Sequence, residues 1–445
     1  MRRTRITCSM LFVWLGWLAL LLSTVPAWAA PAPVVVVPLQ GAIGPATSAY
    51  VLRGLEQARE RGAQLVVLQL DTPGGLDLAM RDIIRAILDS PFPVAGYVAP
   101  GGARAASAGT YILYACHIAA MAPGTNLGAA TPISLMGQDG ESTAATRKSI
   151  NDASAYIRGL AELRGRNVQW AERAVREAVS LPATEALQEH VIDQIATDVP
   201  DLLTRLDGLS VSIHGEQRVL HPLGAELITI TPTWHERLLA LITNPSVALI
   251  LLMLGFYGLV FELLMPGIGV PGIMGSICLL VALYALHLLP LNYAGAALLL
   301  LGLGLMVAEA MVPSFGILGL GGLIAFASGA FMLIDTEAPG FGISLWLIAS
   351  LALLSALFLA VIVGMALQAR RQKVVTGDEK LTGTLAQVIQ LQDNDVYRGM
   401  AIVRGEQWQI RSTAPLHPGQ TVQIQARHGL VLDVAIVNEP HPGES

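Results

Sequence analysis

The sequence has 445 residues, of which 53% are apolar and only 13% are charged, and its formal net charge is −6. This length allows about two to four domains, and the high apolar content indicates that part of the chain lies in a membrane. The slightly acidic balance, with arginines that are scattered rather than clustered, argues against a nucleic-acid-binding protein.

The first residues have the pattern of a secretory signal peptide. Arginines at positions 2, 3 and 5 precede an apolar run from Met10 to Leu22, and Ala27-Trp28-Ala29 forms a small-x-small cleavage site. The apolar run is shorter than the roughly 20 residues of a spanning helix. We therefore predict a signal peptide over 1–29 and an exported chain after it, with an uncleaved anchor as the alternative.

The segment 30–230 has the composition of a soluble α/β domain. Short β-branched runs at Val34–Leu39, Leu65–Leu70 and Val94–Val98 are each followed by glycine or proline and then by a helical pattern, as in 46–61. Such continuous apolar strands are typical of a sheet that is buried on both faces.

The three cysteines do not form a disulfide framework. Cys8 belongs to the signal peptide and Cys278 lies in an apolar span. Cys116 lies in an alanine-rich stretch, where a buried small hydrophobe is favoured over a nucleophile.

The region 245–368 is predicted to cross a membrane. Five apolar segments of about the required length occur in it, at 246–264, 269–289, 292–311, 314–334 and 342–368. An exported N-terminal domain followed by five spans places the C-terminus in the cytoplasm of a bacterial-type inner membrane. Arg370, Arg371 and Lys373 after the last span agree with the positive-inside rule. The acidic loop Asp335–Phe341 fits the outer side.

An internal repeat with an offset of 47 residues runs through this region. Five positions recur in register, Glu262, Pro266, Gly269, Gly272 and Gly275 as Glu309, Pro313, Gly316, Gly319 and Gly322. We interpret the repeat as a duplicated two-helix hairpin that is broken at one membrane surface. For the two glutamates a structural role at helix ends is favoured over a role in an ion pathway.

The tail, 376–439, reads as an all-β domain. Five short alternating runs are separated by glycines, at Thr382–Ile389, Met400–Val403, Gln407–Arg411, Thr421–Ala426 and Leu430–Val437. They predict a small OB-like or SH3-like barrel that serves as an interaction module.

Two glycine-rich segments of the soluble domain could support catalysis. Asp71–Gly75 joins a strand to a helix, and its paired glycines would leave N–H groups free to stabilise an oxyanion, although a plain tight turn is equally compatible. In the second, Gly101–Tyr111, Ser107 is flanked by small residues at the start of a helix. It could be an exposed nucleophile or a helix N-cap packed by alanines.

A nucleophilic serine needs a base, and Lys148 is the best candidate. It is one of only three lysines among 27 basic residues, and the only one before position 373. Lysine can act as a base when it is desolvated, whereas arginine stays protonated. Lys148 is predicted to begin a helix and to border its apolar stripe. The alternative is a surface pair with Asp152. His117 is expected on a strand beyond the serine helix, and His190 in a surface turn.

These segments resemble those of the NfeD family of membrane-bound Clp-class serine proteases. The resemblance rests on Asp71–Gly75, the Ser107 segment, Lys148–Ala153 and Pro123–Gly128, which would shape the wall of the cleft. The order of exported domain, membrane spans and C-terminal barrel is also similar.

The resemblance implies a Clp/crotonase-like fold of repeated ββα units and a Ser–Lys dyad of Ser107 and Lys148. Gly75 and Ala108 N–H would form the oxyanion hole, with Gly74 as a further contributor. It also implies an apolar cleft, a stomatin-like (SPFH) membrane protein as substrate or partner, membrane lipid around the spans, and a homo-oligomer of two or more copies. No metal, nucleotide or other cofactor is implied.

Three other functions are weighed against this one. A signal-peptide peptidase shares the fold and dyad, but the five spans and the barrel favour the NfeD family. A non-catalytic scaffold for stomatin-type proteins would not need both Ser107 and the solitary Lys148. Coenzyme A chemistry lacks an acidic catalytic pair.

Overall fold

The computed structural model describes residues 31–132, 144–312, 314, 316–334, 341–371, 381–392 and 395–437. The predicted signal peptide and most of the predicted acidic loop, 335–340, lie outside these residues. The N-terminal α/β region is built around a six-stranded sheet of order β11-β1-β2-β3-β5-β8. All neighbouring strands in it are parallel. The strands are β1 (Val34–Gln40), β2 (Leu65–Asp71), β3 (Val94–Val98), β5 (Ile118–Met121), β8 (Gln194–Ile195) and β11 (Leu227–Thr229). The three strands predicted from the sequence are therefore confirmed.

Both faces of this sheet are covered, which explains the continuous apolar strands. Because side chains alternate between the two faces, Val35 and Val37 enter one hydrophobic cluster and Val34 and Val36 enter the other.

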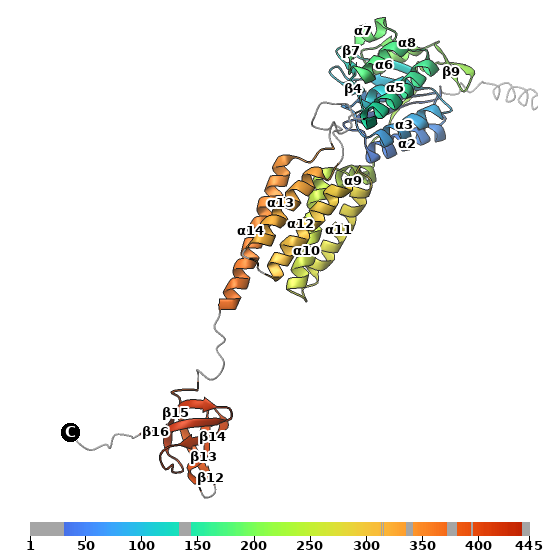
Figure 1. Cartoon of the computed structure of the whole chain (residues 1–445). Helices are drawn as coiled ribbons and strands as arrows, with labels where there is room; N and C mark the ends of the chain where they lie inside the picture. The colour runs from blue at the N-terminus through green and yellow to red at the C-terminus, as the bar shows by residue number, and fades with distance from the viewer. Residues whose placement is uncertain are drawn as a thin grey trace, which may run out of the picture. The chain divides into compact units, whose positions relative to one another are not determined.

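Most helices pack on the first face, whereas α8 packs on the second. The helices of this region, several of which are visible in Figure 1, are α2 (Pro45–Glu60), α3 (Asp77–Leu88), α4 (Ala108–Ala115), α5 (Ala144–Arg164), α6 (Val168–Arg176), α7 (Ala183–Gln188) and α8 (Val199–Leu206).

A small second sheet supports the segment that carries Ser107. It has the order β4-β6-β7, with β4 (Arg104–Ala106) parallel to β6 (Asn126–Gly128) and β7 (Ser180–Pro182) antiparallel to β6. Along the chain, β3, β4 and α4 form one ββα unit. A separate hairpin pairs β9 (Ser210–Ile213) with β10 (Glu216–Val219).

The apolar region consists of five helices that match the five predicted segments closely. They are α10 (Pro245–Leu264), α11 (Val270–His287), α12 (Tyr293–Met311), α13 (Ile317–Met332) and α14 (Leu345–Arg371), and Figure 1 shows α10 to α13 side by side. By length and composition, α10 and α11 could each cross a membrane. The continuous apolar stretches described in the other three are shorter. A short helix, α9 (Trp234–Ile242), precedes α10.

The sequence repeat corresponds to two equivalent helix hairpins, α10–α11 and α12–α13. A Cβ on Gly255 would lie 2.7 Å from the Leu279 nitrogen, and a Cβ on Gly302 would lie 2.4 Å from the Phe326 nitrogen. Both contacts recur at the same offset of 47 residues. The backbones of each hairpin therefore touch at equivalent places, which supports the interpretation as a duplication.

The repeated glutamates have the structural role that we favoured. The Glu262 carboxylate accepts hydrogen bonds from the N–H groups of Gly267 and Gly269. Glu309 is fully buried and accepts from Ser314 and Gly316 N–H at 2.9 and 3.0 Å. Each carboxylate thus satisfies the N–H groups of the turn and of the following helix end, which a helix cannot satisfy itself.

The C-terminal region is a closed five-stranded barrel, as predicted (Figure 1). Its strand order is β12-β13-β14-β16-β15, and its interior is filled by one hydrophobic cluster that includes Val388, Ile410 and Val422. The strands are β12 (Leu385–Gln392), β13 (Asp395–Val403), β14 (Glu406–Ser412), β15 (Thr421–His428) and β16 (Val431–Ile436).

Candidate active site

Ser107 occupies the N-cap position of α4 with a backbone conformation that is unusual for a residue with a side chain. Its φ is 51° and its ψ is −117°. This is the mirror image of the extended region, which glycine enters freely and other residues enter at a cost of about 1–3 kcal/mol. Within the described part of the chain, its hydroxyl caps no N–H group of α4. The ordinary N-cap alternative therefore does not explain this serine.

Hydrogen bonds from both sides of Ser107 hold its backbone in place. Ser107 N–H donates to the Gly128 carbonyl at 3.0 Å, and Ala106 N–H donates to the Thr72 carbonyl at 3.1 Å. Thr110 Oγ1 also donates to Gly128, at 3.0 Å. We expected Pro123–Gly128 to shape the cleft wall. Its closing strand β6 instead lies behind the serine and fixes its backbone.

Gly74 provides the space beside the serine. Its φ is +120°, and a Cβ at this position would lie 2.7 Å from Ser107 Cβ and 3.1 Å from its Oγ. The Gly74 N–H already donates to Thr72 Oγ1 at 3.1 Å. Gly74 therefore fits a steric role better than the predicted role as an oxyanion donor.

The backbone N–H groups of Gly75 and Ala108, which lie near Ser107, have no acceptor within the described residues. The Gly74 carbonyl accepts from Ile43 N–H at 2.8 Å. Because the C=O and N–H of one trans peptide point in opposite directions, the Gly75 N–H points away from Ile43. Ala108 is the first residue of α4, where N–H groups have no partner within the helix.

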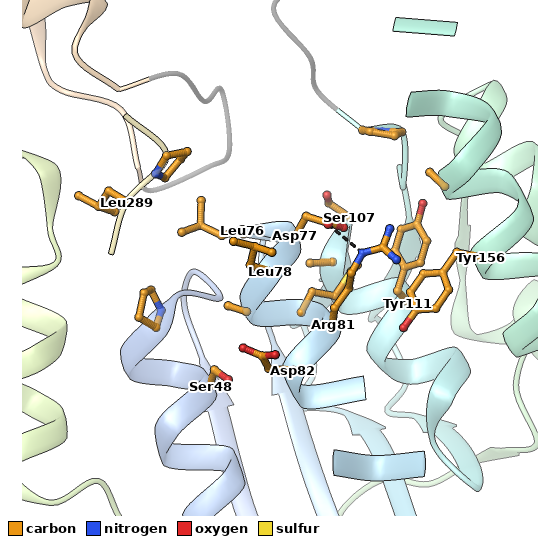
Figure 2. A pocket seen from close by; sticks show the side chains of 18 of the residues that line it. Ser48, Leu76, Asp77, Leu78, Arg81, Asp82, Ser107, Tyr111, Tyr156 and Leu289 are labelled. Carbon is orange, nitrogen blue, oxygen red and sulfur yellow. Dashed lines mark hydrogen bonds and ion pairs between the residues drawn. The ribbon is translucent and has the colours of Figure 1, made fainter. Parts of the chain in front are cut away.

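Ser107, Gly75 and Ala108 line one pocket of about 780 Å³. In Figure 2, Ser107 faces the space that Leu76, Leu78 and Tyr111 border. The Leu78 side chain is 78% exposed. The pocket therefore combines a hydroxyl, two free N–H donors and an apolar wall.

An ion-pair cluster that the sequence analysis missed ties α3 to α5 in this pocket. Arg81 of α3 donates to Asp77 at 2.8 Å and to Asp152 of α5 at 3.0 Å. Its guanidinium also lies 4.5 Å from the centre of the Tyr156 ring. The spacing of Asp77 and Arg81 on one helix could have indicated the first pair, but no local pattern indicates the contacts between helices.

Lys148 is placed differently from our expectation. The helix α5 begins at Ala144, so Lys148 lies in its second turn. The predicted apolar stripe of α5 faces the core, with Ala153, Ile157, Leu160 and Ala161 buried and Ile150 half-buried. The Lys148 side chain, however, is exposed, and it contacts none of the described residues by a hydrogen bond or ion pair. Its neighbour Ser149 lines the pocket.

The prediction that the Lys148 amine is desolvated and the alternative prediction that it pairs with Asp152 are therefore both wrong. The position of Lys148 on α5 explains both results. Other residues of α5 form its buried face, and the carboxylate of Asp152 is hydrogen-bonded to Arg81 of α3.

Comparisons with known proteins agree with these features. Residues 246–365 match the model of the NfeD integral membrane domain, and residues 33–199 match that of the N-terminal domain of NfeD1b. The membrane-bound protease PH1510 of Pyrococcus horikoshii is 34% identical over 411 residues, which cover 90% of this chain and 92% of that protein. The chain belongs to the NfeD family. It is accordingly a membrane protein of a family that contains membrane-bound proteases.

Other relatives cover less of this NfeD chain. The membrane protein NfeD1b of Bacillus subtilis is 30% identical over 262 residues, 56% of this chain and 55% of that protein. A mutant of 1510-N, described as a membrane-bound stomatin-specific protease, has been solved with a substrate peptide. It is 36% identical and covers 47% of this chain and 97% of its own, with a TM-score of 0.44. The 1510-N protease from Pyrococcus horikoshii, specific for a stomatin homolog, is 34% identical and covers 48% and 100%, with a TM-score of 0.43.

The other sequence candidates of this NfeD protein lie away from the pocket. His117 precedes β5, and its Nδ1 faces Val94 N–H at 3.2 Å, at the opposite end of β3 from the serine segment. Burial, together with the nearby positive charge of Arg164, lowers the pKa of His117 to about 3. His190 is exposed in a turn, as predicted. Burial raises the pKa of the Cys116 thiol to about 12, in agreement with a buried hydrophobe.

Among the described residues, no group of three or more histidine, cysteine, aspartate or glutamate side chains is arranged to hold a metal ion.

Proposed function

We propose that this NfeD protein is a membrane-bound serine endopeptidase in which Ser107 is the nucleophile and Lys148 is the general base. The observation that carries the proposal is the strained conformation of Ser107 beside two unpaired N–H groups in one pocket. Strain of this kind is typical of nucleophiles that the backbone presents to a substrate.

In the proposed reaction, Ser107 Oγ attacks the carbonyl carbon of the scissile peptide while Lys148 takes the hydroxyl proton. Gly75 and Ala108 N–H donate to the resulting oxyanion. The intermediate collapses as the C–N bond breaks, and Lys148 gives its proton to the leaving amine. A water molecule, activated by the same lysine, then hydrolyses the acyl-enzyme.

The exposed position of Lys148 adds a condition to this mechanism. An apolar segment that binds in the pocket would exclude water from the amine and favour its neutral, proton-accepting form. Substrate binding would therefore complete the dyad. Arg81, through Asp152, would tie α5, the helix that carries the lysine, to α3 beside the pocket.

The remaining expectations belong to the same proposal. The α/β domain is assigned to the Clp/crotonase-like fold and the tail to the OB-like barrels. Leu76, Leu78 and Tyr111 support an apolar substrate, which the family resemblance suggests is a segment of a stomatin-like membrane protein. We further propose five membrane spans, an exported protease domain, a cytoplasmic barrel and a homo-oligomer.

The test uses a serine-reactive phosphonate on the purified full-length chain, followed by mapping of the labelled peptide. Among the described residues, the serines that line the pocket are Ser48, Ser107 and Ser149. We expect the label on Ser107, unchanged labelling in Ser149→Ala, and a loss of at least about tenfold in Lys148→Arg, since general-base catalysis contributes about 10²–10⁴-fold.

Label on another serine would contradict the role of Ser107, and full labelling in Lys148→Arg would contradict the general-base role. A folded chain that takes no label and cleaves no apolar peptide would favour the alternative, a non-catalytic scaffold for stomatin-type proteins. Preference for free signal peptides as substrates would instead favour a signal-peptide peptidase.

A further inference from the structure

The short helix α9 presents an apolar stripe that no described part of the chain covers. Trp234, Leu238 and Leu241 are 66%, 48% and 56% exposed. Their spacing of i, i+4 and i+7 places them on one face of the helix. Three large apolar side chains in a row on an exposed face mark an interaction surface.

The opposite face of α9 is already occupied. Glu236 is buried and pairs with Arg53 of α2 at 2.6 Å, and it also forms a capping box with Thr233. Thr243, directly after the helix, is buried as well. These contacts fix the rotation of α9 about its axis, so the apolar stripe cannot turn inward.

The position of α9 in the chain identifies what could cover the stripe. The helix ends at Ile242, and α10, which is long and apolar enough to cross a membrane, begins at Pro245. Ile242 packs against the cluster of buried residues that joins the apolar helices. The stripe therefore lies where the chain enters the integral membrane domain.

Exposed aromatic residues mark the same end of the apolar helices. Tyr293 is the first residue of α12 and is 85% exposed, and Trp346, the second residue of α14, is 86% exposed. In Figure 1 the start of α14 lies at the same end of the apolar helices as α9 and the start of α10. Tryptophan and tyrosine are enriched where membrane proteins meet the lipid headgroups.

We infer that α9 is an interfacial helix that lies in the plane of the membrane surface, with Trp234, Leu238 and Leu241 inserted at the boundary of headgroups and acyl chains. The partner is the lipid surface itself. The polar opposite face, fixed by Glu236, and the apolar exposed face give α9 the amphipathic character of such helices.

The test measures the accessibility of nitroxide labels on the full-length chain in phospholipid vesicles. Labels are attached to cysteines at positions 238 and 241 in a Cys8→Ala, Cys278→Ala background, since Cys116 is fully buried. Leu223, which is 51% exposed on the α/β domain, is the matched control. We expect labels at 238 and 241 to be relaxed more by oxygen than by a water-soluble nickel chelate, and the label at 223 to show the reverse.

Each possible result decides the matter. A preference for oxygen at both stripe positions supports insertion. Water-like accessibility at 238 and 241, equal to that at 223, would overturn the inference. So would opposite results at the two stripe positions, because a helix that lies flat in the interface buries both. The readout does not depend on proteolysis, so failure of the proposed function would leave it intact.

Discussion

Replacement of Ser107 by glycine should abolish cleavage and yet stabilise the protein relative to replacement by alanine. Both variants lack the hydroxyl, and both lose the same side-chain contacts beyond Cβ. They differ in the cost of φ 51° and ψ −117°, which alanine retains and glycine removes. The pair of variants therefore isolates backbone strain from chemistry.

The expected difference follows from two opposing terms. Relief of a strained conformation is worth about 1–3 kcal/mol. Glycine loses more chain entropy on folding, which costs about 0.5–1 kcal/mol. With mid-range values for both terms, the net gain is about 1 kcal/mol, and at about 2–4 °C per kcal/mol for a domain of this size the thermal transition should rise by about 2–4 °C.

The assay is thermal unfolding of the full-length chain, with the transition of the α/β domain followed for both variants. Ser154, which lies inside α5, provides the control. There, glycine should be less stable than alanine by about 1 kcal/mol, because the position is helical. If Ser107→Gly were no more stable than Ser107→Ala while the Ser154 pair behaved as expected, the strain at the serine would be refuted.

Three further predictions concern the surroundings of the site. Gly74→Ala should remove phosphonate labelling of Ser107, because its Cβ would lie 2.7 Å from the serine Cβ, and the label yield measures this. His117→Gln should weaken acid denaturation. The pKa of His117 is about 3 in the folded protein and an ordinary 6.5 in the unfolded chain. The unfolded chain therefore binds a proton first, so the contribution of His117 to stability is constant above pH 6.5 and declines as the pH falls towards 3. Urea midpoints between about pH 4 and 7 would show a flatter decline in the variant. Arg81→Gln should lower the free energy of unfolding by about 1–2 kcal/mol through loss of two partly exposed ion pairs and a cation–π contact. Arg81→Lys should have a free energy of unfolding between those of the unmodified protein and Arg81→Gln. An unchanged unfolding temperature in Arg81→Gln would contradict the role of Arg81 in linking α3 to α5.

Local patterns predicted the elements of this chain well. The strands β1 to β3 are continuous runs of β-branched residues between breakers, and the five apolar helices and the barrel strands have clear periods and turn signals. The position of Ser107 at a helix start followed from small residues after a strand. In each case the information lies within a few consecutive residues.

Contacts between distant segments could not be predicted in this way. The stripe of α5 showed which residues are buried, but it did not show that Arg81 reaches Asp152 from another helix. The rarity of lysine drew attention to Lys148, but composition carries no information on exposure. The conformation of Ser107 depends on Gly128 and Thr72, which are brought to it by the sheet.

The buried glutamate at the end of α12 has a consequence for how this membrane domain is assembled. Free N–H groups at a helix end that is buried from water have no water to bind, and each costs several kcal/mol if it is left unpaired. Glu309 and Glu262 supply acceptors from inside their own hairpins. Each hairpin therefore contains the carboxylate acceptor that the N–H groups of its turn require, so it can enter the bilayer without a hydrogen-bond partner from another hairpin. A gene segment that encodes such a unit can be copied in tandem without any new partner for the second copy.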